Sequence, residues 1–215
     1  MKRALKKLCQ SLALGLVMPW ALAERAARRL LGHDVWLNAH GELLSLIPGK
    51  VGSFLRNAYW HLTLRRCPLD CCFLFGTVFT HSEAEVGKRV FIGARCLIGV
   101  ATIGDDTMLA DHVCVLSGKH QHGTSEPGVA FHDQPQEFTR VTIGKNCWLG
   151  TNTVVMADIG ENCVIGAGSV VAKPIPANCV AVGNPARVIR STGPGGTAES
   201  DTGSGPSPLR PGLGT

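Results

Sequence analysis

The sequence predicts an all-β solenoid, in which the chain winds as a parallel β-helix after a helical amino-terminal extension. Two regularities favour this fold: an aliphatic residue recurs every six positions from Val86 onward, and the next residue is usually glycine. The composition agrees, because only 6% of the residues are aromatic and 26 are glycine, so the core must consist mainly of aliphatic and small side chains. With 45% apolar and 17% charged residues, the 215-residue chain is not expected to be disordered throughout.

The repeat consists of ten six-residue windows, with glycine at the second position of eight and Ala110 and Pro176 at the other two. The fifth position always holds a small or β-branched residue, from Val90 through Thr102 to Cys179. Three windows would form one triangular coil, with the first and fifth side chains pointing inward. Glycine would relieve backbone crowding and permit a positive φ near a corner. Residues 73–85 are expected to supply one further coil. The windows begin at Val86, Ile92, Ile98, Ile103, Leu109, Ile143, Leu149, Ile159, Ile165 and Ile175.

The positive charge of the chain is concentrated in its amino-terminal part. Residues 1–66 contain eleven Lys or Arg and three acidic residues, a net charge of +8, whereas the other 149 residues contain ten basic and thirteen acidic residues, a net charge of −3. Because these basic residues adjoin long apolar runs, they fit an anionic membrane surface better than a nucleic acid. We therefore expect a peripheral membrane contact through residues 1–66 and no nucleic-acid partner.

The first apolar run, residues 8–23, follows a basic start and ends in Ala21-Leu22-Ala23, a tripeptide that resembles a signal-peptidase site. The run is shorter than the about 20 apolar residues of a membrane-spanning helix, and helical spacing continues beyond it. An interfacial helix is the preferred interpretation. A secretory signal and a transmembrane anchor are the alternatives.

A second apolar and basic stretch, residues 42–66, predicts another helix that begins near Ser53. Arg56, Arg65 and Arg66 are expected to lie away from its apolar face. This helix contacts lipid, covers the open end of the solenoid, or does both. The apolar face would consist of Phe54, Leu55, Tyr59, Trp60 and Leu62.

These patterns divide the chain into three parts. Residues 1–72 form the basic helical extension, and residues 73–190 form the β-helix with an inserted loop at 118–140. Residues 191–215 are rich in Gly, Pro, Ser and Thr and are expected to be a disordered tail.

Nine cysteines cannot all pair within one chain, and no paired CxxC motifs with zinc spacing are present. We interpret the five cysteines of the repeat as small buried apolar residues, and we expect a reducing compartment. These five are Cys96, Cys114, Cys147, Cys163 and Cys179.

The loop at residues 118–140 has no six-residue register and concentrates titratable side chains, and an insertion of this length is usually functional. His120 is our candidate general base, because an imidazole with a pKa near neutrality can take a proton from a hydroxyl group as its oxygen attacks an activated acyl carbonyl. His122 is the competing candidate. His112, next to Asp111 on a strand, either belongs to the site or faces solvent.

Over about residues 75–190 the repeat resembles the hexapeptide-repeat acyltransferases. The most specific segments are residues 141–150 (VTIGKNCWLG), 165–171 (IGAGSVV) and 182–189 (VGNPARVI). The last segment is similar to the galactoside, maltose and colanic-acid O-acetyltransferases. The basic extension and the shortened corner at 155–159 resemble acyltransferases of bacterial exopolysaccharide clusters. The resemblance implies a left-handed parallel β-helix that assembles as a homotrimer.

The resemblance also implies acetyl-CoA as the co-substrate. In the related enzymes the catalytic histidine follows the last inward residue by the seven-residue step that separates Val113 from His120. Lys173 and Arg187 can pair with phosphates, while Ala172 stands where relatives often have threonine. The positions that match the coenzyme-binding residues of the family are Trp148, Gly150, Thr151, Ala167, Gly168, Lys173 and Arg187.

No metal is expected. The γ-class carbonic anhydrases share this architecture and bind zinc through three histidines, two of them in an HxxxxH pair. The spacings from His112 to His120 and from His120 to His122 do not match that pattern.

Taken with the resemblance, the sequence predicts an acyl-CoA-dependent O-acyltransferase, with acetyl as the expected acyl group. Its acceptor would be a sugar hydroxyl of a saccharide or glycolipid in bacterial surface polysaccharide synthesis, at the cytoplasmic face of the inner membrane. Two alternatives stay open: acetylation of a small acceptor such as serine or an amino sugar, and a non-catalytic β-helical scaffold.

Overall fold

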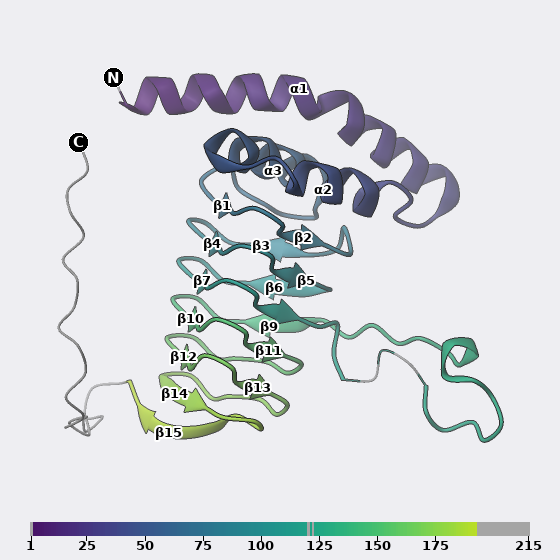
Figure 1. Ribbon diagram of the computed structural model, residues 1–215, viewed down its shortest axis with the longest axis vertical. Coiled ribbons are helices and arrows are strands. Elements are labelled where there is room, and N and C mark those ends of the chain that lie inside the picture. The colour runs from purple at the N-terminus through teal and green to yellow at the C-terminus, as the bar shows by residue number, and fades with distance from the viewer. Residues whose placement is uncertain (1, 120, 122, 193–215) are drawn as a thin grey trace.

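The computed structural model of the chain describes residues 2–119, 121 and 123–192. Three helices stack on one end of a three-sided parallel β-helix, and the strand β15 lies at the opposite end (Figure 1). The structure therefore confirms the predicted solenoid and its helical extension. The helices are α1 (Lys2–Leu31), α2 (Leu37–Ser45) and α3 (Gly49–Thr63).

Each side of the β-helix is a sheet whose strands come from successive coils. The seven-stranded sheet contains β1 (Cys72–Phe73), β4 (Phe91–Ile92), β7 (Met108–Leu109), β10 (Trp148–Leu149), β12 (Val164–Ile165), β14 (Cys179–Val182) and the antiparallel β15 (Arg187–Ser191). The five-stranded sheet contains β2 (Val78–Phe79), β5 (Leu97–Ile98), β8 (Cys114–Val115), β11 (Val154–Val155) and β13 (Val170–Val171). The third contains β3 (Glu85–Val86), β6 (Ala101–Ile103) and β9 (Val141–Ile143). A bridge from Ile143 to Ile159 and another from Ile159 to Ile175 continue it.

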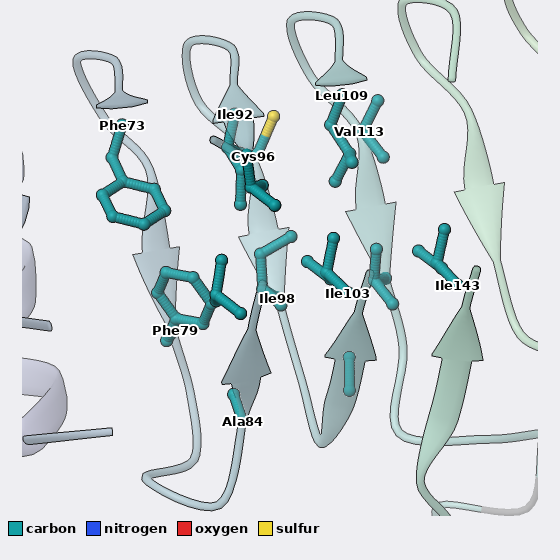
Figure 2. Packing of buried hydrophobic residues seen from close by; sticks show 14 of the residues in the cluster. Phe73, Phe79, Ala84, Ile92, Cys96, Ile98, Ile103, Leu109, Val113 and Ile143 are labelled. Atoms are coloured by element: carbon teal, nitrogen blue, oxygen red, sulfur yellow. The ribbon is translucent and has the colours of Figure 1, made fainter. Parts of the chain in front are cut away.

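The first-position side chains of the windows stack in the interior of the prism. Figure 2 shows Ile92, Leu109 and Ile143 pointing into this shared core. Phe73 and Phe79 occupy the same inward positions in the preceding coil, which confirms the additional coil expected in residues 73–85.

The second-position glycines allow the coils to approach closely. A Cβ atom on Gly144 would lie 2.4 Å from the amide nitrogen of Glu161 on the next coil, so crowding explains these residues. The expected positive φ at this position is wrong, because the left-handed conformation falls two residues later, at the fourth position of the window. Asparagine adopts this conformation more readily than most residues. Fourth-position residues with positive φ are Arg89, Arg95, Asp106, His112, Asn146, Asn152, Asn162, Gly168 and Asn178.

The fifth-position side chains do more than fill space. Several donate a hydrogen bond to the carbonyl oxygen of the second-position residue one coil further on. Cysteine and threonine are equivalent here, so Cys96, Cys147 and Cys163 are hydrogen-bond donors as well as small buried residues. The expected burial of Cys114 is wrong, because it lies half-buried on the outer side of β8, next to the inward Val115. Examples are Cys96 to Ala110 (3.2 Å), Thr107 to Gly144 (2.8 Å), Cys147 to Gly160 (3.1 Å), Thr153 to Gly166 (3.4 Å) and Cys163 to Pro176 (3.1 Å).

Thr102 is the exception to the inward fifth position. The window that begins at Ile98 is one residue short, so Ala101 turns inward and Thr102 lies half-buried on the outer face of β6. All nine cysteines of the chain are free thiols.

The helices close the amino-terminal end of the solenoid. The ring of Trp60 on α3 meets Phe79 of the first coil with ring centroids 5.1 Å apart, and Phe79 meets Phe73 at 5.6 Å. The expected capping role of residues 42–66 is therefore confirmed. The helix begins at Gly49, directly after Pro48, instead of near Ser53.

Arg56 corrects the expectation that the arginines of this helix lie away from the apolar face. Its side chain is 1% exposed and donates hydrogen bonds to four backbone carbonyl oxygens. These carbonyls end α2 and open the first coil, so one guanidinium joins α2, α3 and β1. The acceptors are Phe73 (3.1 Å), Leu44 (3.0 Å), Ser45 (3.3 Å) and Ile47 (2.8 Å).

The sequence left a transmembrane anchor open at the amino-terminal end and predicted that the solenoid ends at residue 190. Among the described helices, none has both the length and the apolar character needed to cross a membrane. At the other end, β15 includes Ser191, and Thr192 bonds to Asn178, so the solenoid extends two residues past the boundary predicted at 190. The rest of the predicted tail lies outside the described residues.

Candidate functional site

Gly150, Thr151, Ala167 and Gly168 come together at one corner of the prism, between the seven-stranded and five-stranded sheets. We call residues 150–153 and 166–169 the first corner. The amide of Gly168 donates to the carbonyl of Thr151 at 2.8 Å, which stacks the two coils in register. Thr151, Ala167 and Gly168 are exposed, and a Cβ atom on Gly168 would meet no atom within 4 Å. The first corner is therefore an open surface with small side chains.

Arg187 extends the first corner toward the carboxyl-terminal end of the solenoid. It pairs with Val182 across β14 and β15, and the side chain of Val182 lies over Gly166. The amide of Gly183 also donates to Ser169 Oγ at 3.1 Å. An exposed guanidinium group thus follows the small residues along the same edge.

Trp148 lies apart from this row. It projects from the seven-stranded sheet, 51% exposed, and lines a groove of about 510 Å³ that does not include Thr151, Ala167 or Gly168. The far edge of this groove is a ladder of asparagines, which we call the third corner. Asn146 donates to Asn162, and Asn162 donates to Asn178, both at 3.0 Å.

The inserted loop leaves the solenoid at a different corner, between the five-stranded and three-stranded sheets. We call this the second corner. It consists of the loop base, at Ser117 and Val141, and of residues 156–158 and 172–174 on the next two coils. The amide of Thr139 donates to the carbonyl of Ser117 at 3.0 Å, so the loop returns where it leaves. Figure 1 shows the loop projecting away from the solenoid. Lys173 is exposed at this corner, two coils beyond the loop base and one corner away from Thr151.

The two candidate bases, His120 and His122, lie outside the described residues. The remainder of the loop is organised by Gln134, which is buried. Its amide nitrogen donates to the carbonyls of Glu126 and Val129, at 3.3 and 3.0 Å. Phe138 packs on the ring of His81, with centroids 4.7 Å apart.

His112, whose role the sequence left open, lies at the first corner. It occupies the fourth position of its window with a φ of 60°, and its coil directly precedes that of Thr151. The amide of Asn152 donates to the carbonyl of Asp111 at 3.1 Å, which fixes the stacking. His112 is exposed and aligned with Asn152 and Gly168, so it belongs to the same edge as the small residues.

Sequence reasoning missed two features of this surface. The asparagine ladder was not predicted, although Asn146, Asn162 and Asn178 share the fourth window position and could have been found from that spacing. Trp148 is separated from Thr151 because it precedes the inward Leu149. A residue in that position points outward from a flat side of the prism instead of lying at a corner. Within the described residues, no three His, Cys, Asp or Glu side chains gather as they would around a metal ion.

Comparisons with known proteins agree with this architecture. A family model described as the hexapeptide repeat of succinyl-transferase matches residues 84–110 and 140–173. A maltose O-acetyltransferase from Clostridium difficile 630 is 25% identical, with a TM-score of 0.60 over 74% of this chain and 87% of that one. A galactoside acetyltransferase in complex with coenzyme A is also 25% identical, with a TM-score of 0.54 over 73% and 80% of the two chains.

A hexapeptide-repeat acetyltransferase from Vibrio cholerae, solved with acetyl coenzyme A, shares the fold at 19% identity, with a TM-score of 0.60 over 74% of this chain and 88% of that one. No curated protein sequence matches the chain. The matched segments are thus hexapeptide repeats, and the solenoid is the left-handed parallel β-helix that the resemblance implied.

Proposed function

We propose that the protein is an acetyl-CoA-dependent O-acetyltransferase that acts on a sugar hydroxyl. The observation that carries this proposal is the first corner, where Thr151, Ala167, Gly168 and Arg187 form one exposed row. These are the positions at which the family resemblance implies coenzyme binding. The 25% identity to a maltose and a galactoside acetyltransferase supports a sugar as the acceptor.

The chemistry of the row fits coenzyme A. The absence of side-chain bulk at Gly168 and Ala167 leaves room for an extended pantetheine arm along the corner. Arg187 and Lys173 provide cationic groups for the phosphates, and a guanidinium can bind a phosphate through two parallel hydrogen bonds. Residues 150–168 would thus orient the thioester, and Arg187, in the same row, would anchor the phosphates. Lys173 lies one corner away and would have to contact the coenzyme from there.

His120 is the proposed general base, with His122 as the alternative. The imidazole takes the proton of the acceptor hydroxyl while the oxygen attacks the thioester carbonyl. The resulting tetrahedral intermediate collapses, the C–S bond breaks, and the imidazolium returns its proton to the departing coenzyme A thiolate. The products are an O-acetyl ester and coenzyme A, and no covalent enzyme intermediate is needed.

The separation of the loop from the first corner supports a homotrimer. The loop whose sequence contains the proposed base leaves the solenoid at the second corner, and the whole five-stranded sheet separates that corner from the row at Thr151. A neighbouring copy packed against the first corner would supply the loop that this copy lacks there. We therefore propose that each site forms between two subunits.

The proposed setting is the synthesis of bacterial surface polysaccharide at the inner face of the membrane. The basic helical extension supports this setting, because its net charge of +8 and its apolar runs fit an anionic membrane surface. The acceptor would then be a saccharide or a glycolipid.

Acetyl transfer to defined acceptors tests this function. The purified chain would be incubated with acetyl-CoA and with maltose, a galactoside, glucosamine or serine, and the products would be identified by mass spectrometry. We expect a mass gain of one acetyl group on a sugar, released by mild alkali as an ester is. Transfer only to an amino group or to serine would overturn the proposed sugar hydroxyl acceptor. Failure to bind coenzyme A would overturn the enzymatic function and favour a scaffold.

A further inference from the structure

The helix α1 has one face fixed against the protein. Ala13, Val17 and Ala21 are buried where α1 packs along α3. Gln10 Nε2 donates to the carbonyl of Leu69 at 2.6 Å, and the amide of Trp36 donates to the carboxylate of Glu24 at 2.7 Å. These contacts lie along most of the helix, so the opposite face must point away from the solenoid.

That outward face is apolar along its whole length. From Leu5 to Leu16 its leucines recur at intervals of three and four residues, the spacing of a single helical stripe, and Leu30 falls on the same stripe. Gly15, Pro19, Ala23 and Ala26 fall on the same stripe by helical periodicity, and no charged residue does. The exposed leucines of this stripe are Leu5 (62%), Leu8 (56%), Leu12 (61%), Leu16 (71%) and Leu30 (84%), while Leu22 (56%) and Leu31 (58%) are exposed outside it. We call this the leucine stripe.

The flanks of α1 are basic. Its sequence contains seven Lys or Arg and one acidic residue, and the acidic residue, Glu24, is fully buried. Lys6, Lys7, Arg25 and Arg29 lie beside the leucine stripe, since each is offset from it by about 100° or more around the helix. The exposed surface of α1 is therefore an apolar stripe between rows of positive charge.

The apolar surface continues beside the helix. A groove of about 620 Å³ runs between the amino-terminal part of α1 and α3, with Leu5, Val51, Phe54 and Leu69 in its lining and Lys6 at its side. Figure 1 shows α1 lying across the end of the molecule, over α3 and far from β15. The stripe and the groove thus form one end surface of the protein.

We propose that the leucine stripe inserts into the surface of an anionic lipid bilayer, with α1 in the plane of the membrane and the solenoid extending into the aqueous phase. Amphipathic helices with basic flanks bind such surfaces through both buried apolar area and attraction to anionic headgroups. The charge of α1 argues against a second copy of the chain as the partner of the leucine stripe. Two stripes packed face to face would bring the seven basic residues of one α1 close to the seven of the other.

The proposal has a consequence for the acceptor, and this consequence rests on the proposed function. A membrane-bound trimer would hold its sites on the last coils of the solenoid, away from the lipid surface, so the acceptor class becomes a lipid-linked saccharide whose glycan extends into the aqueous phase. The membrane contact itself does not depend on catalysis.

Vesicle co-sedimentation of the full chain tests the contact. We expect the protein to bind vesicles of mixed phosphatidylglycerol and phosphatidylcholine, to bind pure phosphatidylcholine vesicles much more weakly, and to lose binding as salt is raised. Leu12→Glu should lower the partition coefficient at least about tenfold, since it removes an inserted leucine and adds a charge within the stripe. Ser11→Glu is the matched control, because it adds the same charge at the neighbouring exposed position beside the stripe, and it should have a much smaller effect.

Three results would overturn the proposal. The first is no binding of the unmodified chain to anionic vesicles. The second is an equal loss of vesicle binding for Leu12→Glu and Ser11→Glu. The third is an assembly that light scattering detects without lipid and that Leu12→Glu dissociates. Both substitutions are exposed, and thermal unfolding checks that each variant folds. Acetyl transfer to a water-soluble sugar, measured without vesicles, separates failure of this proposal from failure of the proposed function.

Discussion

A Cβ atom on Gly150 would lie 2.5 Å from the amide nitrogen of Ala167 on the next coil. Gly168, at the same corner, has open space around it and a φ of +70°. The two glycines therefore serve different purposes. Gly150 lets neighbouring coils stack, whereas Gly168 lets the chain turn.

This difference predicts a large loss of stability for a substitution at Gly150 and a small change for one at Gly168. Gly150→Ala should lower the free energy of unfolding by about 1–3 kcal/mol, because the methyl group must push two coils apart. Gly168→Asn should change it by less than about 1 kcal/mol, since asparagine adopts the same conformation at four other fourth positions of the repeat. Urea unfolding measures both, and equal effects would contradict this account of the repeat.

The asparagine ladder predicts an order of stabilities at Asn162. Asn162→Ala removes two side-chain hydrogen bonds and places alanine at a φ near +57°, which together should cost about 2–3 kcal/mol. Asn162→Gly loses the same bonds without the conformational strain and should cost less. A glycine variant less stable than the alanine variant in thermal or urea unfolding would show that the conformation is not the main cost.

Arg56 should be the most sensitive charged residue of the cap. Arg56→Met leaves four buried carbonyl oxygens without their donor and should lower the free energy of unfolding by about 3 kcal/mol or more. Arg65→Gln is the control, because its exposed ion pair with Glu85, at 3.5 Å, is worth less than about 1 kcal/mol. Similar losses in the two variants would mean that Arg56 does not hold the cap.

The core thiols predict a loss of stability in alkali. Burial raises the pKa of Cys96 and of Cys147 to about 11, against an ordinary value of 9.0. Above pH 9 the unfolded chain releases these protons while the folded chain keeps them, so the free energy of unfolding should fall as the pH rises from 9 to 11.

The variant Cys147→Thr should make that fall shallower, because threonine fills the equivalent position at Thr107 and Thr153 without ionising. Urea unfolding at several pH values provides the measurement. An unchanged slope would show that Cys147 does not contribute to the alkaline loss.

The basic residues proposed for the coenzyme phosphates predict a specific kinetic change. Arg187→Gln and Lys173→Gln should each raise the KM for acetyl-CoA about tenfold, the loss of one charge-assisted contact, with little change in kcat. Lys88→Gln alters an exposed lysine at the third corner's edge and should leave KM unchanged. A similar KM for all three variants and the unmodified protein would place the phosphates elsewhere.

Much of the fold could be predicted because one local rule repeats. Each window obeys the same constraint, so an inward Ile92 or Ile165 could be recognised without knowing the rest of the chain. The role of the fourth position escaped prediction, because Arg89, His112 and Asn146 share a conformation but no chemical character. The burial of Arg56 also escaped, since nothing local shows that four backbone carbonyls will converge on one position of a helix.

The candidate site was less predictable than the fold. Adjacent positions such as Gly150 and Thr151 stayed together because they share a corner. Lys173 separated from them because six residues of chain turn through a third of the prism, and Trp148 because it faces outward on the flat side before the corner. Whether the loop reaches the first corner depends on how copies pack, and the hexad pattern carries no information about that contact.

The measurement that tests the central claim most directly is acetyl transfer by His120→Ala, with acetyl-CoA binding measured on the same preparation. We predict that kcat falls about 10²–10⁴-fold while the affinity for acetyl-CoA stays within a factor of about two, with His122→Ala much less affected. Full activity in both single variants and in the double variant would contradict the assignment of a loop histidine as the base, and with it the proposed chemistry of the site.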